Sequence, residues 1–454
     1  MIRTRRISSV ELITAHLDRI KEVNPKINAA VEVFSKQALA DAQQSDAKLA
    51  VGERCGPLHG VPFSVKDSID VKGARTTAGT VGRKGARPTE RDATLVARLR
   101  AAGGIPIAKT NLPDLLFSFE TDNLIYGRTN NPYDLTRTPG GSSGGESALI
   151  AACGSPLGLG SDALGSVRLP AAFCGIASIK PTSGRLPRTG HVPPAGGWIE
   201  ALWQIGPMAR HVEDLQLAME LLAGPDGADF TSPPVPLGET GQLAGMRAAF
   251  FTSNGFAPCA PGIEESVKRC AQFLSRTGMR VEERRPPGVE TVYELELSLL
   301  GADGCKGIDE YLRGAGSNET HPFLNAFVDR MRPHRVSAVD FARRWEQWDE
   351  YRTGLDRFFG EYDIVLCPVY PQTALAHGGS LNENNFRGFS YTMAWSVGGL
   401  PAATVRCGEE NGLPINVQVV AGRWRDMTGL AVCRAIEEEF GGWKAPPSLR
   451  DRNK

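Results

Sequence analysis

Along the chain, segments with the 3.6-residue period of an amphipathic helix alternate with segments that have the period of two of a strand. Residues 7–50 have the helical period, with a break at "VNPKINA", and residues 92–104 and 290–360 have it again. Strand-like segments lie between and after them, among them "GIPIAKT", "SPLGLGSD", "IASIKPT", "GMRAAFF", "DIVLCPV" and "INVQVVAG". Strands that alternate with helices favour a layered α/β fold.

One strand-like segment places polar residues together. Residues 56–73, "GPLHGVPFSVKDSIDVKG", are bounded by glycine and proline, and apolar residues alternate with others around Phe63 and Val65. Because successive side chains of a strand point to opposite faces, Ser64 and Lys66 are predicted to share the face opposite the apolar residues.

The stretch "TPGGSSGGES" (138–147) suggests several kinds of site. A phosphate-binding loop would need a lysine that this stretch lacks. "GLGSDA" (158–163) fits G-x-G-x-x-A, but no acidic ribose partner follows at the expected spacing. "GSSGG" (141–145) matches G-x-S-x-G around Ser143, but a loop rather than a strand precedes it and no later histidine is distinctive.

Composition excludes several classes of protein. The 454 residues hold 51 Lys and Arg against 51 Asp and Glu, so no basic excess indicates a nucleic-acid partner. The nine cysteines are scattered without a C-x-x-C pair, which argues against a zinc site. Neither a signal peptide nor an apolar run long enough for a membrane span is predicted, and a cytoplasmic location is expected.

The glycine-rich stretch continues as "TPGGSSGGESALIAACGSPLGLGSDALGSVRLPAAFCGIASIKPTSGRLP", which resembles the signature of the amidase signature family of serine hydrolases. "GPLHGVPFSVKD" is similar to the family's lysine strand, and further matches follow in order. The resemblance implies one α/β domain over 1–454, with a large mixed twisted sheet covered by helices on both faces. It further implies a signature core at about 56–215, and the poorly matching 290–360 would be a variable, cap-like helical region.

By resemblance, Ser166 is the nucleophile, Ser142 is a bridging serine preceded by a cis peptide bond, and Lys66 is the terminal base. A protonated lysine cannot accept a proton, but burial among neutral hydroxyls lowers its pKa. Neutral Lys66 would then draw a proton from Ser142 as Ser142 draws one from Ser166. The reverse path would protonate the departing amine.

The resemblance also implies groups around this relay. Fixed N–H donors must stabilise the negative oxygen of a tetrahedral intermediate. They are expected at Ala163, Leu164, Gly165 and Ser166. Supporting roles are expected for Ser143, Asp162 and Arg168. Contacts with substrate are expected at Gly140, Gly141, Leu164, Trp198 and Trp203.

One position of the expected oxyanion loop departs from the family. The family shows glycine where this chain has Leu164, and leucine resists a positive φ. The loop is therefore expected either to use angles that leucine tolerates or to differ in its donors. Ser178 and Ser396 also replace residues that the family prefers.

The expected function is hydrolysis of a C–N bond in a small-molecule amide, with a carbamate or an aryl ester as other substrates, through an acyl-enzyme on Ser166. No metal or organic cofactor is implied, and the oligomeric state stays open, a homodimer included. One alternative is the glutaminase subunit of a tRNA-dependent amidotransferase, which typically has glutamine where this chain has Leu169. Another is a catalytically silent binding protein of the same fold, which the change at Leu164 would favour.

Overall fold

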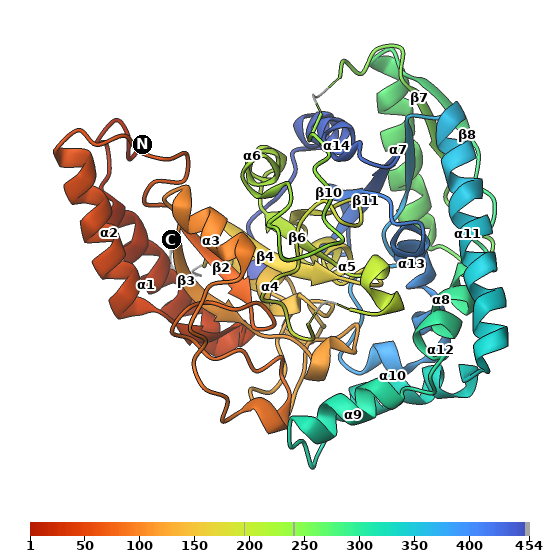
Figure 1. Ribbon diagram of the computed structural model, residues 1–454. Helices are drawn as coiled ribbons and strands as arrows, with labels where there is room; N and C mark the ends of the chain where they lie inside the picture. The colour runs from red at the N-terminus through yellow and green to blue at the C-terminus, as the bar shows by residue number, and fades with distance from the viewer. Residues whose placement is uncertain (195, 239–240, 450–454) are drawn as a thin grey trace.

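A single mixed β-sheet organises the molecule. The computed structural model describes residues 1–194, 196–238 and 241–449, which form one α/β domain around an 11-stranded sheet (Figure 1). Its strands are β1 Ala30–Val33, β2 Pro62–Lys66, β3 Ile105–Thr110, β4 Leu157–Asp162, β5 Ala177–Lys180, β6 Gln204–Ala209, β7 Arg247–Phe250, β8 Arg280–Glu283, β9 Ile364–Pro368, β10 Ala402–Glu410 and β11 Leu413–Ala421. The α/β fold that the sequence predicts is confirmed.

Strands distant in sequence lie side by side in this sheet. The order is β1-β3-β2-β4-β6-β5-β10-β11-β9-β7-β8. The pairs β2–β3, β2–β4, β7–β8 and β7–β9 are parallel, and the other pairs are antiparallel. The C-terminal hairpin β10–β11 thus sits between β5 and β9, so the end of the chain completes the middle of the sheet.

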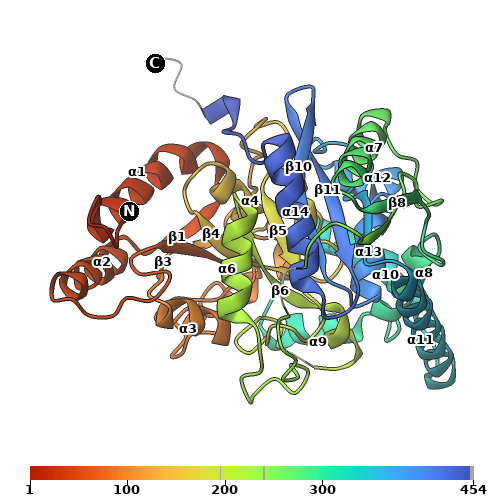
Figure 2. The same cartoon turned by 90° about the horizontal axis from the view of Figure 1, so that it is seen from above.

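Helices cover one face of the sheet along most of its width. Apolar side chains of this face pack against those of the helices in one large core. In the view from above, α6 and α14 lie side by side across the sheet (Figure 2). The helices of this face are α3 Thr94–Ala101, α6 Val212–Leu222, α7 Pro261–Arg276 and α14 Asp426–Phe440.

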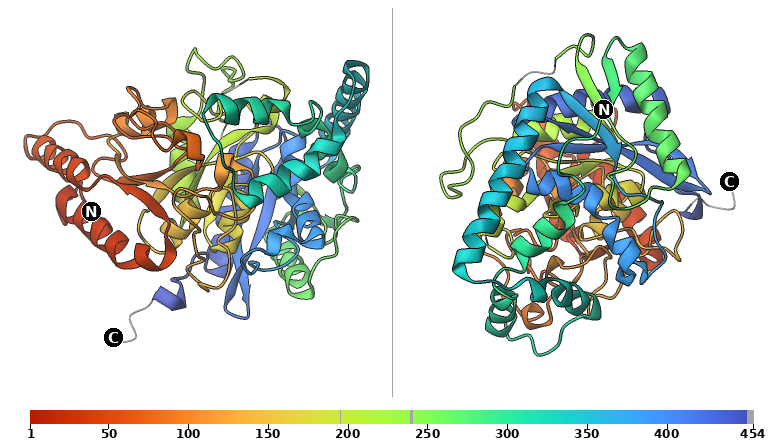
Figure 3. Two further views of the ribbon diagram at one scale, coloured as in Figure 1. Left: turned by 90° about the horizontal axis from the view of Figure 1, so that it is seen from below. Right: turned by 90° about the vertical axis from the view of Figure 1, so that its right-hand side faces the viewer.

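The opposite face carries shorter helices. They are α4 Gly144–Ala151, α5 Arg168–Phe173, α12 Glu383–Arg387 and α13 Ser390–Val397. Every residue of α4, α5 and α13 is buried. Two longer helices, α1 Ser9–Ile27 and α2 Ser35–Ala50, lie at the β1 end of the sheet (Figures 1 and 3).

Residues 290–360 form a helical region at the other end of the molecule, as the pattern predicts. Its helices are α8 Val292–Leu300, α9 Lys306–Gly314, α10 Pro322–Met331 and α11 Ala338–Glu361. The long α11 runs along the outside of this region (Figures 1 and 3). α9 has no buried residue, whereas α8 is mostly buried against its neighbours.

Local expectations are met in part. Ser8 caps α1 with a complete capping box, but α1 continues through Pro25 to Ile27, where the sequence indicated a break. The strands β1 and β6 are absent from the sequence prediction, and β6 contains Gly206 and Pro207, which are uncommon inside strands. No helix in the described part of the chain is long and apolar enough to cross a lipid bilayer.

Candidate active site

Lys66 ends a strand that is buried along its whole length. Phe63 and Val65 of β2 point into the core beneath the long helices, so Ser64 and Lys66 point to the other face, toward α4. The Lys66 side chain is 0% exposed. The alternation of residue types in this segment therefore predicts the side of the sheet on which the lysine lies.

Three serine residues surround the Lys66 amine. Nζ lies 2.6 Å from Ser142 Oγ and 3.0 Å from Ser143 Oγ. It also lies 3.1 Å from Ser161 Oγ and 3.4 Å from the Ser161 carbonyl oxygen. Sequence reasoning missed Ser161, because one serine in a glycine-rich strand carries no signal of its own.

These contacts direct the amine toward Ser142. The Ser143 hydroxyl donates to the Ser161 carbonyl oxygen at 3.2 Å, since a carbonyl can only accept. The Ser143 oxygen is then left to accept from Lys66 Nζ. An uncharged amine that donates its two protons to Ser143 and Ser161 has its lone pair free for the Ser142 hydroxyl.

The environment of Lys66 favours an uncharged amine. Burial lowers the pKa of Lys66 well below its ordinary value, while the carboxylates of Asp162 and Glu146 act in the opposite direction. Desolvation wins because the nearest partners are neutral hydroxyl groups rather than carboxylates.

The turn before α4 places Ser142 against Lys66. The Gly141–Ser142 peptide bond is cis, as the resemblance implies. A Cβ on Gly141 would lie 2.7 Å from the backbone of Phe119 and Glu120, so only glycine fits this close approach. Ser143, not Ser142, occupies the position before α4, and its side chain makes no capping hydrogen bond.

Ser166 lies close to this turn. The Ser143 N–H donates to the Ser166 carbonyl oxygen at 3.0 Å, which ties the two segments together. Ser166 is 7% exposed, and within the described residues its hydroxyl forms no hydrogen bond, to Ser142 or to any other group. The Lys66–Ser142 contact is therefore formed in this structure, and the Ser142–Ser166 contact is not.

The loop before Ser166 uses ordinary backbone angles at Leu164. Leu164 keeps a negative φ, whereas Gly165 has a φ of 135°. A Cβ on Gly165 would lie 2.3 Å from Thr392 Oγ1, so this position does require glycine. The same threonine donates to the Leu164 carbonyl oxygen at 2.6 Å, which fixes the loop from α13.

Four N–H groups were expected as oxyanion donors, and one is already occupied. The Gly165 N–H donates to Asp162 Oδ1 at 2.8 Å. Within the described residues, the N–H groups of Ala163, Leu164 and Ser166 have no partner. These three remain as candidates for binding a negative oxygen.

An ion pair beneath the loop holds it in place. Arg168 contacts both oxygens of Asp162 at 2.9 Å, and both side chains are 0% exposed. Arg168 also donates at 2.8 Å to Gln418 Oε1 and to Ser396 Oγ. Burial alone would raise the pKa of Asp162, but Arg168 holds it below its ordinary value. These contacts hold the turn, and the supporting roles of Asp162 and Arg168 in catalysis stay a prediction.

An apolar cavity of about 290 Å³ reaches the neighbourhood of the loop through Trp203, although Lys66, Ser142 and Ser166 do not line it. Trp203 lines it, and the pairing of Asp162 with Gln204 places Trp203 next to Ala163. The other lining residues come from the core and from the helical region: Leu115, Phe117, Pro193, Pro194, Gly196, Gly197, Ile199, Leu300, Asp303, Gly307, Ile308, Tyr311 and Met331. Gly140, Gly141 and Leu164 are not among them, and the side chain of Trp198 lies outside the described residues.

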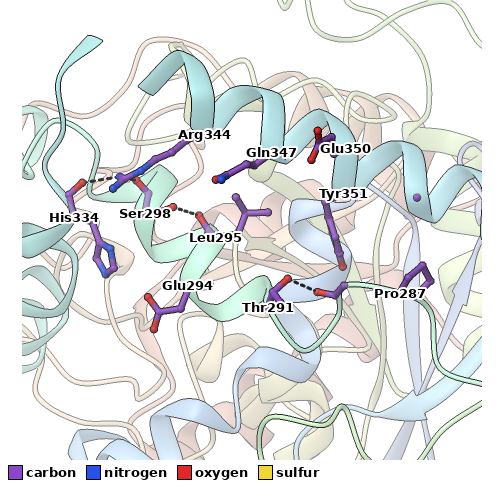
Figure 4. A pocket seen from close by; sticks show the side chains of 12 residues that line it. Pro287, Thr291, Glu294, Leu295, Ser298, His334, Arg344, Gln347, Glu350 and Tyr351 are labelled. Carbon is purple, nitrogen blue, oxygen red and sulfur yellow. Dashed lines mark hydrogen bonds between the residues drawn. The ribbon is translucent and has the colours of Figure 1, made fainter. Parts of the chain in front are cut away.

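A larger groove of about 650 Å³ lies between α8 and α11 (Figure 4). Arg344 lines this groove, and its guanidinium group donates to the carbonyl oxygens of Ser298 and His334. Glu294 and Glu350 line its rim. None of the residues around Lys66 lines this groove.

Other nucleophiles and bases do not fit the site. The Cys174 thiol is fully buried, and burial raises its pKa to about 12. His59 hydrogen-bonds to the Ser45 carbonyl oxygen, as expected for a packing residue. No group of three or more His, Cys, Asp or Glu residues in the described part of the chain is arranged to hold a metal ion.

The chain is similar in sequence and in structure to several known proteins. The amidase family profile matches residues 11–430. An indoleacetamide hydrolase of Bradyrhizobium diazoefficiens is 33% identical, over 97% of this chain and 85% of the relative. One subunit of the glutamyl-tRNA(Gln) amidotransferase of Picosynechococcus sp. is 32% identical, over 97% of each chain. A 6-aminohexanoate cyclic dimer hydrolase, solved with its substrate, superimposes with a TM-score of 0.87 at 26% identity, over 99% of this chain and 97% of the other.

The fold and the matched segments together define a hydrolase of C–N bonds built on an α/β sheet. The chain belongs to the amidase signature family. The family that the sequence motifs indicate is thus confirmed.

Proposed function

We propose that this protein hydrolyses the C–N bond of a small-molecule amide through an acyl-enzyme on Ser166. Uncharged Lys66 takes a proton from the Ser142 hydroxyl, which takes one from Ser166 as the Ser166 oxygen attacks the carbonyl carbon. The same path in reverse delivers the proton to the leaving amine. The 2.6 Å contact between the fully buried Lys66 Nζ and Ser142 Oγ carries this proposal.

The Ser142–Ser166 contact would form when substrate binds. Catalytic hydrogen bonds are often long in a free enzyme and shorten in the complex. The Ser166 hydroxyl is free to turn toward Ser142, because no other hydrogen bond holds it among the described residues. The free N–H groups of Ala163, Leu164 and Ser166 would bind the oxyanion.

The cavity beside Trp203 supports an apolar acyl group as the preferred substrate part. Most of its wall is aliphatic or aromatic, and its volume suits a group of the size of an aryl ring. The indoleacetamide hydrolase among the relatives is named for an amide with an aromatic acyl group. Because α9 and α10 supply part of the wall, the region 290–360 would act as the cap of this cavity, over a signature core of about 56–215.

An amidotransferase subunit is the second candidate, since a relative of that name matches at 32% identity. Leu169, where that subunit typically has glutamine, favours the stand-alone hydrolase. Glutamine-dependent amide synthesis in a complex reconstituted with the partner subunits would reverse this preference.

Labelling with a fluorophosphonate probe tests the proposed function. The probe should form one adduct, and peptide mapping should place it on Ser166. Absence of an adduct on Ser166 at pH 8 would instead favour a silent binding protein of the same fold. Release of free acid from a phenylacetyl p-nitroanilide would identify the hydrolase activity directly.

A further inference from the structure

One buried carboxyl group close to Lys66 has no part in the proposed chemistry. Glu146 lies in the first turn of α4 and is 0% exposed. Ser64 donates to its Oε1 atom, and Thr110 donates to its Oε2 atom at 2.6 Å. A Cβ on Gly158 would lie 1.8 Å from Oε1, so the neighbouring strand leaves room for this carboxyl group.

Strand β2 carries Lys66 and also Ser64, the residue that donates a hydrogen bond to Glu146. Ser64 and Lys66 lie two residues apart on β2 and point to the same face. The carboxyl group that Ser64 holds is therefore within electrostatic reach of Lys66 Nζ, and each of the two groups shifts the pKa of the other.

Other charged groups nearby are paired elsewhere. Asp162, at the end of β4, also acts on Lys66, but it is tied to Arg168. Lys109, next to Thr110 on β3, points to the opposite face and contacts Asp67 at 3.1 Å. Among the described residues, Lys66 is therefore the charged side chain that shifts the pKa of Glu146.

Burial raises the pKa of Glu146 to about 7, although hydrogen bonds from Ser64 and Thr110 and the charge of Lys66 act against this rise. Near neutral pH the carboxyl group therefore exchanges between its neutral and ionised forms. The ionised form stabilises a protonated Lys66, and the neutral form does not. Only an uncharged Lys66 can accept a proton from Ser142.

We propose that Glu146 is a positioning residue of the relay, whose carboxyl group, fixed by Ser64 and Thr110, sets the fraction of Lys66 that carries no charge. This inference rests on the proposed function. It makes Glu146 act through Lys66, without contact with substrate.

The test is the pH dependence of Ser166 labelling by a fluorophosphonate, which needs no knowledge of the natural substrate. In the wild type the labelling rate should rise with pH as Lys66 loses its proton. Glu146→Gln keeps the size of the side chain and removes its charge, so the rise should move to lower pH by about one unit. The rate at the alkaline plateau should stay within about tenfold, because the relay groups are unchanged. A rise that stays in place or moves to higher pH would overturn the proposal.

A second variant covers the case in which Glu146→Gln does not fold. Thr110→Val removes one donor to the carboxylate, which disfavours its ionised form, so the rise should move in the same direction. Glu120→Gln is the matched control, because Glu120 is a buried carboxylate that accepts from the N–H groups of Gly378 and Ser380. In Glu120→Gln the labelling rate should rise at the same pH as in the wild type. A shift as large as that of Glu146→Gln would count against a specific role of Glu146.

The outcomes separate this inference from the proposed function. If Lys66→Ala is labelled as fast as the wild type at every pH, the relay itself is wrong. If labelling depends on Lys66 but Glu146→Gln and Thr110→Val leave its pH dependence unchanged, only the role of Glu146 is wrong.

Discussion

The surroundings of Lys66 in the signature core and those of Glu296 in the helical region 290–360 treat buried polar groups in opposite ways. In the core, Lys66, Asp162 and Arg168 are fully buried, and each makes several hydrogen bonds. In the helical region, Glu296 of α8 is equally buried, yet within the described residues neither of its carboxyl oxygens has a partner. The groups around Lys66 are thus fixed by directional bonds, whereas the Glu296 carboxyl group is held by the packing around it.

Under the proposed function, this difference separates the residues that would carry the chemistry from those that would set the specificity. A proton relay needs atoms held within tenths of an ångström, which a network of hydrogen bonds provides. A cavity wall needs only a suitable shape and polarity, which packed helices can change without disturbing the relay.

The largest effect is expected from the relay itself. Lys66→Ala and Ser142→Ala should each lower kcat/KM by about 10²–10⁴-fold, because each removes a step of proton transfer. Hydrolysis of a p-nitroanilide checks this. Lys180→Met is the control: Lys180 is also fully buried, and its amine donates to the Pro181 carbonyl oxygen rather than to a serine. It should keep the rate within about tenfold. Near-normal rates in both relay variants at alkaline pH would refute the relay.

A smaller loss is expected at the ion pair beneath the oxyanion loop. Asp162→Asn leaves the Arg168 charge buried and weakens the bond to the Gly165 N–H, so kcat should fall by about 10²–10³-fold. The free energy of unfolding should fall by about 3–5 kcal/mol in a denaturant titration. In the control Asp134→Asn, which breaks the surface pair of Asp134 and Arg137, stability should change by about 1 kcal/mol or less. Equal effects of the two variants would contradict a special role of the buried pair.

A change of specificity is expected at the cavity wall. Ile308→Ala shortens a side chain of α9 that lines the cavity, so it should lower kcat/KM for a phenylacetyl p-nitroanilide by about tenfold. The rate for the acetyl analogue, which does not reach this wall, should stay unchanged. Glu310→Ala, an exposed position of the same helix, should alter neither rate. A parallel loss for both substrates in Ile308→Ala would place the acyl group elsewhere.

The smallest effect, on stability alone, is expected at Glu296. Burial raises its pKa well above the ordinary value, so the folded protein binds a proton that the unfolded chain releases above about pH 4.5. The wild type therefore loses stability as the pH rises from there, and Glu296→Gln does not share this loss. The Tm of the variant minus that of the wild type should increase between pH 5 and pH 8.

The matched control for this prediction lies on the same helix. Glu294 is exposed, and Glu294→Gln should shift Tm by the same small amount at both pH values. A Tm difference for Glu296→Gln that does not change with pH would show that the Glu296 carboxyl group is ionised in the folded protein.

The sequence predicts the core of the site better than its surroundings. Alternation around Phe63 and Val65 places Lys66 on the correct face, because the period of a strand alone decides this. Ser161 and Glu146 could not be found in that way, since a serine and a glutamate in glycine-rich segments look like many others until the fold brings them to Lys66. Trp203 lines the cavity, and its contact with substrate stays a prediction.

The rest of the cavity depends on contacts between segments far apart in sequence. The ring centroids of Phe117, in the core, and Phe327, in α10, lie 5.7 Å apart. The Tyr311 hydroxyl of α9 accepts a hydrogen bond from Arg83. Amphipathic periodicity predicts that residues 290–360 are helical, but it does not indicate which side of these helices meets the core. The loop before Ser166 is an intermediate case. The sequence predicts either leucine-compatible angles at Leu164 or a change in the donors, and the structure has the leucine-compatible angles.

The position of the C-terminal hairpin in the middle of the sheet has a consequence for biosynthesis. Arg168 takes one of its partners, Gln418, from 250 residues further along the chain. The ribosome therefore synthesises Lys66, Ser142 and Ser166 long before it synthesises β11, the strand that supplies Gln418. The growing polypeptide should therefore lack this support of the loop before Ser166 until β11 has been made.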